Sequence, residues 1–113
     1  MSGKIFRYSV KEPSFSLIRD GIKKIEGRLF KNTFCQINPG DYIIFYNRKD
    51  NFKVRVAAIK NYNNFRDMLV SERIKLVTPL SNSLDESISI YRRFYSVEDE
   101  KKYGVIAIHV VNI

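Results

Sequence analysis

Hydrophobic and polar residues alternate along several short segments of the chain, and a period of two is typical of β-strands. In residues 4–10, KIFRYSV, every second position holds Phe, Tyr or Val, and residues 22–30 and 52–62 alternate in the same way. Residues 42–46, YIIFY, and 105–113, VIAIHVVNI, are apolar enough for largely buried strands. The pattern therefore predicts about five or six strands spread over the whole chain.

Helices are predicted where the apolar spacing changes from two to three or four residues. Residues 64–72, NFRDMLVSE, place their apolar side chains on one helical face, and Asn63 or Asn64 is the expected N-cap. Residues 83–96, SLDESISIYRRFYS, open on the spacing S-x-x-E of a capping box and continue with apolar residues at helical spacing. Two helices are therefore expected between the fourth and the last strand.

Proline, glycine and charged residues mark where these elements end. Pro13 can open a further short helix and Gly21 can end it, because glycine readily takes a positive φ. The turn NPGD at residues 38–41 and the hairpin loop NRKDN at residues 47–51 favour antiparallel pairing. Residues 97–104, VEDEKKYG, are expected to form a charged loop. We therefore predict an α+β fold, a small β-barrel or curled sheet of mostly antiparallel strands with two or three short helices packed on it.

The composition fits one globular domain over residues 1–113. Hydrophobic residues make up 44% of the chain and charged residues 28%, so a core and a solvated surface are both expected. No segment approaches the ~18 consecutive apolar residues of a membrane span, and the N-terminal residues lack the apolar run of a signal peptide. We therefore expect an intracellular protein without membrane contact, in the cytoplasm or alternatively in the nucleus.

A single cysteine and a single histidine restrict the chemistry of the chain. Cys35 excludes an intramolecular disulfide, which agrees with a reducing compartment. As a nucleophile Cys35 would need His109 in contact with it, and a small hydrophobic side chain is the favoured role. A zinc site would need carboxylates to fill most of its ligand shell. We therefore predict no metal and no cofactor.

The charge of the chain points to a class of partner. The net charge is +8, from 20 Lys and Arg against 12 Asp and Glu, and a positive field attracts polyanions such as nucleic acids. Eight Phe and seven Tyr supply aromatic faces on which unstacked bases can lie, although most of these rings are expected to fill the core. The composition therefore favours RNA as a partner without locating a site.

The stretch GIKKIEGR, residues 21–28, concentrates charge next to a predicted helix end. On a regular strand Glu26 and Arg28 share a face with Lys24, so Glu26 and Arg28 can form an ion pair that orients the guanidinium group. Lys23 joins them only if the chain bends before Glu26. Two interpretations stay open: a partly buried ion pair beside a solvated lysine, or a site in which lysine, carboxylate and guanidinium act together.

The same stretch fits the pattern G-x-K-x-x-E-x-R and resembles the signature of the ASCH domain, a PUA-like β-barrel family. The flanking segments agree in order. EPSFSLIRDG resembles the short helix before the motif, INPGDYIIF resembles the strand after it, and FRDML and IYRRFYSVEDEKKYGVIAIHV resemble the later helices and the closing strand. The resemblance spans roughly Phe6 to Val111. It implies a small PUA-like β-barrel with the motif in a cleft beside it, and a role in RNA binding or processing.

Some bacterial members of this family are amidohydrolases that remove the acetyl group from N4-acetylcytidine, and another member is a ribonuclease. By resemblance, Lys23 matches the lysine that acts in the amidohydrolase as a base or nucleophile activator, and Arg28 matches the motif arginine. Glu26 stands where the amidohydrolase has an active-site threonine. Glu72 or Glu86 could supply the glutamate of its middle helical region. Lys23 and Glu26 are therefore the candidate catalytic residues.

Other residues could extend a binding surface. Tyr46 ends a strand near a turn, where its ring could line the cleft. Lys53 and Arg55 share one face of a hairpin strand, which either extends a basic surface or is simply solvated. Tyr91 and Tyr95 stand beside two arginines at 92 and 93, and core packing of these rings is favoured over stacking on bases. The candidate ligand-binding residues are Lys23, Lys24, Glu26, Arg28, Tyr46, Lys53 and Arg55.

Three functions follow from the sequence. The one we favour is binding of RNA or of a modified nucleotide in a basic cleft at the motif. The alternative is a hydrolase acting on RNA or on an acylated nucleobase such as N4-acetylcytidine, with Lys23 and Glu26 as acid–base groups. A third is an interaction domain that regulates transcription or translation through protein partners.

Overall fold

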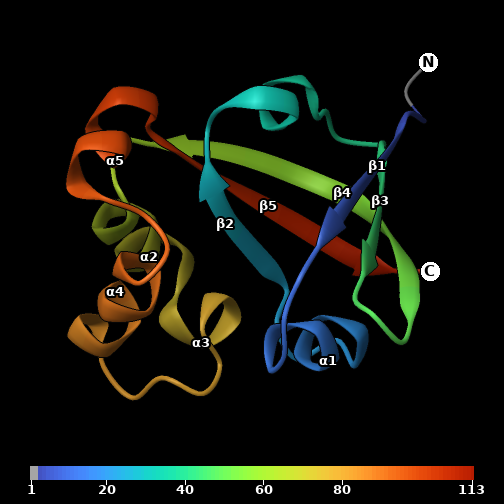
Figure 1. The fold of residues 1–113 in the computed structure, drawn as a ribbon, viewed down its shortest axis with the longest axis horizontal. Coiled ribbons are helices and arrows are strands. Elements are labelled where there is room, and N and C mark those ends of the chain that lie inside the picture. Colours follow the sequence, from blue (N-terminus) through green and yellow to red (C-terminus); the bar gives the residue numbers. More distant parts are fainter. Residues whose placement is uncertain (1–2) are drawn as a thin grey trace.

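The computed structural model describes residues 3–113, and residues 1 and 2, at the start of the predicted domain, lie outside the described part. Strands and short helices follow one another along this part of the chain (Figure 1). In chain order they are β1 (Ile5–Ser9), α1 (Ser14–Arg19), β2 (Ile25–Leu29), the 3-10 helix η1 (Asn32–Gln36), β3 (Tyr42–Tyr46), β4 (Asn51–Tyr62), α2 (Phe65–Glu72), α3 (Ile74–Val77), α4 (Leu84–Arg92), α5 (Val97–Tyr103) and β5 (Val105–Asn112).

The five strands form one mixed sheet in the order β1-β3-β4-β5-β2. The β1–β3 pair is parallel, and the other three pairs are antiparallel. The long strand β4 shifts its register against β5 between Val56 and Ala58, and such an irregularity bends and twists a strand locally. The sheet curls strongly into a half-barrel with β1 and β2 as its edge strands (Figure 1). The predicted α+β class, with a curled and mostly antiparallel sheet, is confirmed.

The core occupies both faces of this sheet. Ile106 and Ile108 of β5 pack with buried residues of β3 and β4 on one face. Val105 and Ala107 of β5 pack on the other face with β2 and with buried residues of α2 and α4. Because β5 is covered on both faces, its sequence is a nearly continuous apolar run rather than an alternating one.

Polar side chains begin the helices where the sequence predicts them. Asn64 accepts a hydrogen bond from the backbone N–H of Asp67 at the start of α2, at an Oδ1···N distance of 2.7 Å. Ser83 accepts one from the N–H of Glu86 at the start of α4, over 3.1 Å. Each bond satisfies a backbone donor that has no partner within the helix. The predicted helices and their caps are thus confirmed, but the second helix ends at Arg92, four residues before the predicted end at Ser96.

The expectation of a charged loop at residues 97–104 is wrong, because Val97–Tyr103 forms helix α5. Its acidic residues lie in the first turn and its lysines in the last turn, where they complement the helix dipole. Gly104, with φ of +72°, follows the helix end. The charges that indicated a loop therefore stabilise a helix. Two further short helices, η1 and α3, are also present where the pattern predicted none.

Strand β2 lies between a group of helices on one side and α1 on the other, and this placement positions the site. Figure 1 shows α2, α3, α4 and α5 gathered on one side of β2, and α1 with β1 and β3 on the other. Gly21 has a φ of +77°, and it follows α1 as predicted. Beyond it, the backbone N–H of Lys24 donates to the Leu76 carbonyl over 3.0 Å. The chain therefore bends between α1 and β2 and contacts the end of α3 there.

Candidate functional site at the GxKxxExR motif

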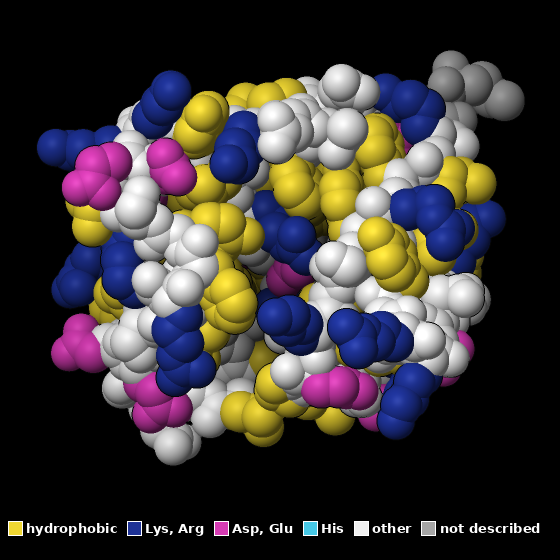
Figure 2. Space-filling model, in the orientation of Figure 1, with side chains coloured by type: hydrophobic (Ala, Val, Ile, Leu, Met, Phe, Trp, Pro, Cys, Tyr) yellow, Lys and Arg dark blue, Asp and Glu magenta, His cyan; other side chains and the backbone are white. Residues whose placement is uncertain are grey.

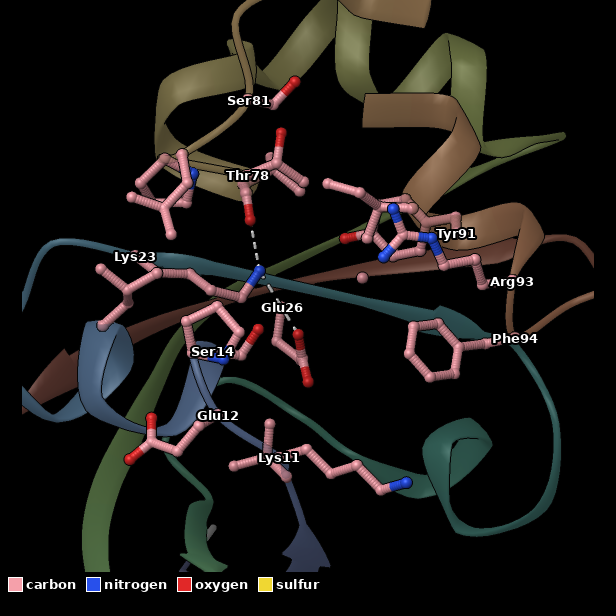
Figure 3. Close-up of a pocket in the computed structure, with 18 of the residues that line it drawn as sticks. Lys11, Glu12, Ser14, Lys23, Glu26, Thr78, Ser81, Tyr91, Arg93 and Phe94 are labelled. Carbon is pink, nitrogen blue, oxygen red and sulfur yellow. Dashed lines mark hydrogen bonds and ion pairs between the residues drawn. The ribbon is translucent and has the colours of Figure 1, made fainter. Parts of the chain in front are cut away.

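A cleft of about 480 Å³ lies between the β1–α1 connection and the C-terminal end of α4. Residues 23 and 26–28, on and just before β2, form part of its lining, together with residues 9–14, 77–81 and most of 90–95. We call this cavity the motif cleft. Figure 2 shows it as a hollow with acidic atoms at its bottom and Lys and Arg side chains around it. Figure 3 shows the same cleft from close by, with Lys23 and Glu26 near its centre.

Lys23 is buried in the motif cleft, with only 4% of its surface exposed. Its Nζ donates to the carbonyl oxygens of Ile25, over 2.8 Å, and of Val77, and it lies 3.4 Å from Glu26 Oε1. Burial lowers the pKa of Lys23, and the carboxylate of Glu26 opposes that shift without reversing it. Three acceptors surround the amine, and only the ammonium form offers three protons to match them. We therefore assign Lys23 as a charged group that is fully engaged within the protein.

Glu26 lies between two cations. Its Oε2 is 2.9 Å from Arg28 Nη2 and 3.0 Å from Arg28 Nε, while its Oε1 faces Lys23. Burial raises the pKa of Glu26, but Arg28 and then Lys23 outweigh burial and the net shift is downward. Glu26 is therefore an anion at neutral pH, even though it is buried, with only 7% of its surface exposed. The predicted Glu26–Arg28 pair is present, and the interpretation that leaves Lys23 solvated is wrong.

Arg28 is held in a fixed orientation on all sides. Besides Glu26, its Nη2 donates to the carbonyl of Ser9 over 3.2 Å and so bridges the two edge strands of the half-barrel. Its guanidinium carbon lies 5.9 Å from the ring centroid of Tyr8 and 5.3 Å from that of Phe34. One fifth of its side chain remains exposed. Arg28 is therefore a positioned cation at the edge of the motif cleft.

The aromatic wall of the motif cleft requires a glycine in β2. A Cβ atom at Gly27 would come within 2.8 Å of both Met68 Cε and Tyr91 Oη, closer than real Cβ contacts. The ring of Tyr91 stacks on that of Phe65 at a centroid distance of 4.3 Å, which fixes it against the core. Burial and the nearby Glu26 carboxylate raise the pKa of Tyr91 well above its usual value. Tyr91 therefore presents a neutral hydroxyl beside the floor of the cleft.

Hydroxyl groups form a second wall opposite Glu26. Thr78 Oγ1 lies 2.7 Å from Ser87 Oγ, and Ser87 donates to Ser81 Oγ over 2.7 Å. Thr78 and Ser81 line the motif cleft, and all three residues are buried. Because each hydroxyl has a protein partner, this chain of hydroxyls is ordered before any ligand arrives. It supplies fixed polar groups of the kind that orient ligands in pockets.

Exposed cations and an exposed aromatic ring surround the mouth of the motif cleft. Lys11, Arg93 and Phe94 line the cleft and are exposed to solvent. Figure 3 shows the Phe94 ring at the opening, with Arg93 on one side and the Lys11 amine on another. The ring of Tyr95, the next residue, is half-buried and stacks on Phe65 at 5.3 Å. The cleft thus combines a buried charge cluster with an accessible cationic and aromatic mouth.

Four of the binding residues predicted from the sequence do not line the motif cleft. Lys24 is exposed beside the motif, and Tyr46 at the end of β3 packs with Arg7, whose guanidinium carbon is 5.6 Å from the ring centroid. Lys53 lies over the ring of Tyr42 at 4.6 Å, and Arg55 is exposed on the same strand, β4. The structure therefore brings Lys23, Glu26 and Arg28 together in the motif cleft, and a binding role for the other four stays a prediction.

Glu72 and Glu86, the two candidates for the glutamate that the amidohydrolase uses, also lie outside the lining of the motif cleft. Glu72 accepts from the hydroxyl of Tyr62 over 2.6 Å, and its Oε1 is 2.9 Å from His109 Nε2. Glu86 is exposed in the first turn of α4. Within residues 3–113, no three His, Cys, Asp or Glu side chains gather closely enough to hold a metal ion. Of Glu26, Glu72 and Glu86, only Glu26 therefore lines the motif cleft.

Several lining residues were missed from the sequence. Thr78 and Ser81 follow a short helix that the pattern did not predict, and Lys11 precedes α1 without any motif around it. Phe94 was missed because only its neighbours Tyr91 and Tyr95 were considered for stacking on bases, and core packing was favoured for both. The one available signal was the basic and aromatic run YRRFY at residues 91–95, which places cations beside rings.

The curled sheet, with the motif in a cleft at its edge, agrees with the PUA-like architecture that the resemblance implies. The family model of the ASCH domain matches residues 9–113, and the chain belongs to this family. The crystal structure of the hypothetical protein PH0355 is 43% identical over 100% of both chains, with a TM-score of 0.87. The solution NMR structure of protein PF0455 from Pyrococcus furiosus is 46% identical, with a TM-score of 0.75 over 97% of this chain and 96% of that one. No curated protein matches the chain.

The helices of the structure are all short. Within residues 3–113, none of them combines the length and the apolar composition that crossing a membrane requires. The longest, α4, has nine residues, whereas a membrane-spanning helix needs about 20.

Proposed function

We propose that the chain binds RNA or a modified nucleotide in the motif cleft. The observation that carries this proposal is the buried Lys23–Glu26–Arg28 cluster at the floor of an open cleft. A buried ionic cluster is weak evidence of stabilisation, because desolvation offsets most of the attraction between its charges. A fixed anion and cation at the floor of a cavity can instead hydrogen-bond the donors and acceptors on a base edge.

The size and the walls of the motif cleft support the same ligand class. Its volume of about 480 Å³ lies within the range of small-molecule sites. Phe94 offers an aromatic surface, Tyr91 a neutral hydroxyl, and Lys11 and Arg93 offer cations for a phosphate. The net charge of +8 adds a long-range attraction for RNA. Family membership agrees, because ASCH domains are PUA-like domains associated with RNA.

Binding is better supported than hydrolysis. A lysine that acts as a general base must be neutral and must reach the substrate. Although burial lowers the pKa of Lys23, its nitrogen contacts two carbonyls and the Glu26 carboxylate, so its donors are already used within the protein. Glu26 in turn is held as an anion by two cations. The cluster is therefore organised to recognise a ligand without itself exchanging protons.

The test is the affinity of purified protein for fluorescein-labelled single-stranded RNA over a series of salt concentrations. We expect affinity to fall steeply with salt, because binding releases counterions from phosphates. Arg93→Ala should weaken binding and reduce the slope of log affinity against log salt by about 0.7, the value for one single-strand phosphate contact. Arg66, exposed on α2 and outside the cleft lining, is the matched control for the same charge change.

Two results would contradict the proposal. One is wild-type protein that has no salt-sensitive affinity for the RNA. The other is an equal loss of affinity in Arg93→Ala and in Arg66→Ala, because the charge of the whole molecule would then matter and the cleft would not.

A further inference from the structure

We propose that the ligand is a single strand of at least two nucleotides, with a second base stacked on Phe94 at the mouth of the motif cleft. This inference rests on the proposed function and adds the length and conformation of the RNA. The feature behind it is a phenylalanine ring that is 65% exposed at the mouth of a polar cavity. An exposed ring by itself is ordinary on a protein surface, so the groups around Phe94 must identify its partner.

The backbone fixes the direction in which Phe94 points. The N–H groups of Phe94 and Tyr95 both donate to the carbonyl of Tyr91, over 3.0 Å each, so a tight turn ends α4. Within this turn Tyr91 and Tyr95 both stack on Phe65 in the core. Phe94 projects outward instead, and its ring is tilted by 56° from that of Tyr95 at a centroid distance of 6.4 Å. Its exposure is therefore built into the turn.

The charges beside the ring identify the partner. Arg93 and Lys11 flank Phe94 at the opening (Figure 3), and both are exposed. Glu12 also lines the cleft, but its carboxylate accepts from the backbone N–H of Ser16 over 3.0 Å and from its hydroxyl over 2.6 Å. An aromatic face between two cations fits a base and its phosphates. An apolar protein surface would desolvate both cations without pairing them.

The geometry also requires an unpaired strand. One base in the motif cleft is surrounded by Glu26, Tyr91 and the hydroxyl wall, so it cannot keep a Watson–Crick partner. The next base emerges at the mouth, where Phe94 lies, and the phosphate between the two bases passes Lys11 or Arg93. Duplex RNA would have to be unstacked at both positions, which costs free energy. Single-stranded RNA is already free to adopt this arrangement.

The experiment compares two lengths of ligand. Affinities are measured for the four nucleoside 5′-monophosphates and for the four homopolymeric RNA hexanucleotides, with wild type, Phe94→Ala and Phe94→Tyr. We expect Phe94→Ala to bind its preferred hexanucleotide about 5- to 150-fold more weakly, the range for loss of one stacking side chain. Phe94→Tyr should retain most of the affinity. Binding of monophosphates should change less than about twofold, since they lack the second base that would stack on Phe94.

Matched controls make the outcome specific. Val70 on α2 is also 65% exposed and does not line the cleft, so Val70→Ala should bind every probe as wild type does. The inference is overturned if Phe94→Ala binds the hexanucleotides normally, or if it loses monophosphates and hexanucleotides equally. Wild type that binds none of the probes would overturn the proposed function itself. If Arg93→Ala weakens hexanucleotide binding but Phe94→Ala does not, the proposed function stands and only the stacking of a second base on Phe94 is overturned.

Discussion

Replacing Glu26 with glutamine removes the one carboxylate that contacts both Lys23 and Arg28, while it keeps the shape of the side chain. In the folded protein Glu26 Oε1 lies 3.4 Å from the lysine nitrogen, and Oε2 lies 2.9 Å from the nearest arginine nitrogen. After the change the Lys23 ammonium retains only its two backbone carbonyls as partners. Arg28 retains only Ser9 and the two aromatic rings beside it. Glu26→Gln should therefore destabilise the fold through two buried charges at once.

The magnitude follows from the burial of the two cations. Removing one partner of a buried ion pair costs about 3–5 kcal/mol, because the other charge is left without compensation. Lys23 is 4% exposed and cannot rehydrate, whereas Arg28 is 20% exposed and regains some water. We therefore expect a loss near the lower limit, about 3 kcal/mol. This is a large part of the total stability of about 5–15 kcal/mol of an ordinary domain.

Urea denaturation at neutral pH measures this loss directly. The midpoint should fall while the slope m stays constant, because the folded state keeps its compactness. Glu98→Gln, in the exposed first turn of α5, is the matched control and should cost less than about 1 kcal/mol. Lys23→Met combined with Glu26→Gln should cost less than the sum of the single changes, since the pair is then removed together. A free energy of unfolding for Glu26→Gln within about 0.5 kcal/mol of wild type would refute the reasoning.

Three further predictions follow. Gly27→Ala should lower the free energy of unfolding by about 1–3 kcal/mol, because its methyl group meets Met68 and Tyr91 at 2.8 Å; unchanged thermal stability would contradict the tight packing. Two cations hold the pKa of Glu26 below its ordinary 4.5, so the stability it gives is present above that value and is lost as pH falls through the lower folded pKa. Wild type should therefore lose stability between about pH 5 and 3 more steeply than Glu26→Gln, and parallel pH curves would refute this. Incubation with N4-acetylcytidine or RNA should give no product by mass spectrometry, whereas turnover that disappears in Lys23→Ala would favour the hydrolase.

The part of the site that lies on β2, the Glu26–Arg28 ion pair, could be predicted from the sequence. Alternation along residues 25–29 places Glu26 and Arg28 on one face, and the structure confirms their ion pair. The placement of Lys23 could not be predicted. Its ammonium is buried because the chain bends before β2 and because the carbonyl of Val77, 54 residues away, turns toward it. Contacts over such a distance depend on the packing of α3, which no local pattern indicates.

The fold was predictable to the extent that each element had a periodic signal. The strands and helices α2 and α4 have clear apolar spacing, and their N-caps are polar residues at the expected positions. The segment at 97–103 has the same kind of cap, Ser96, but only charged residues fill its middle. Its helix is stabilised by capping, charge order and the bond from the Phe65 N–H to buried Glu100, over 2.9 Å. A hydrophobic pattern alone cannot reveal such a helix.

The central claim is that RNA lies in the motif cleft, and NMR of uniformly ¹⁵N-labelled protein tests it most directly. Titration with a single-stranded RNA hexanucleotide should shift the backbone amide signals of residues 26–28 and 93–95 most strongly. Signals of residues 53–55 should move little, because this part of β4 lies outside the lining of the motif cleft. The largest shifts at 53–55, or no shifts at saturating RNA, would contradict the account.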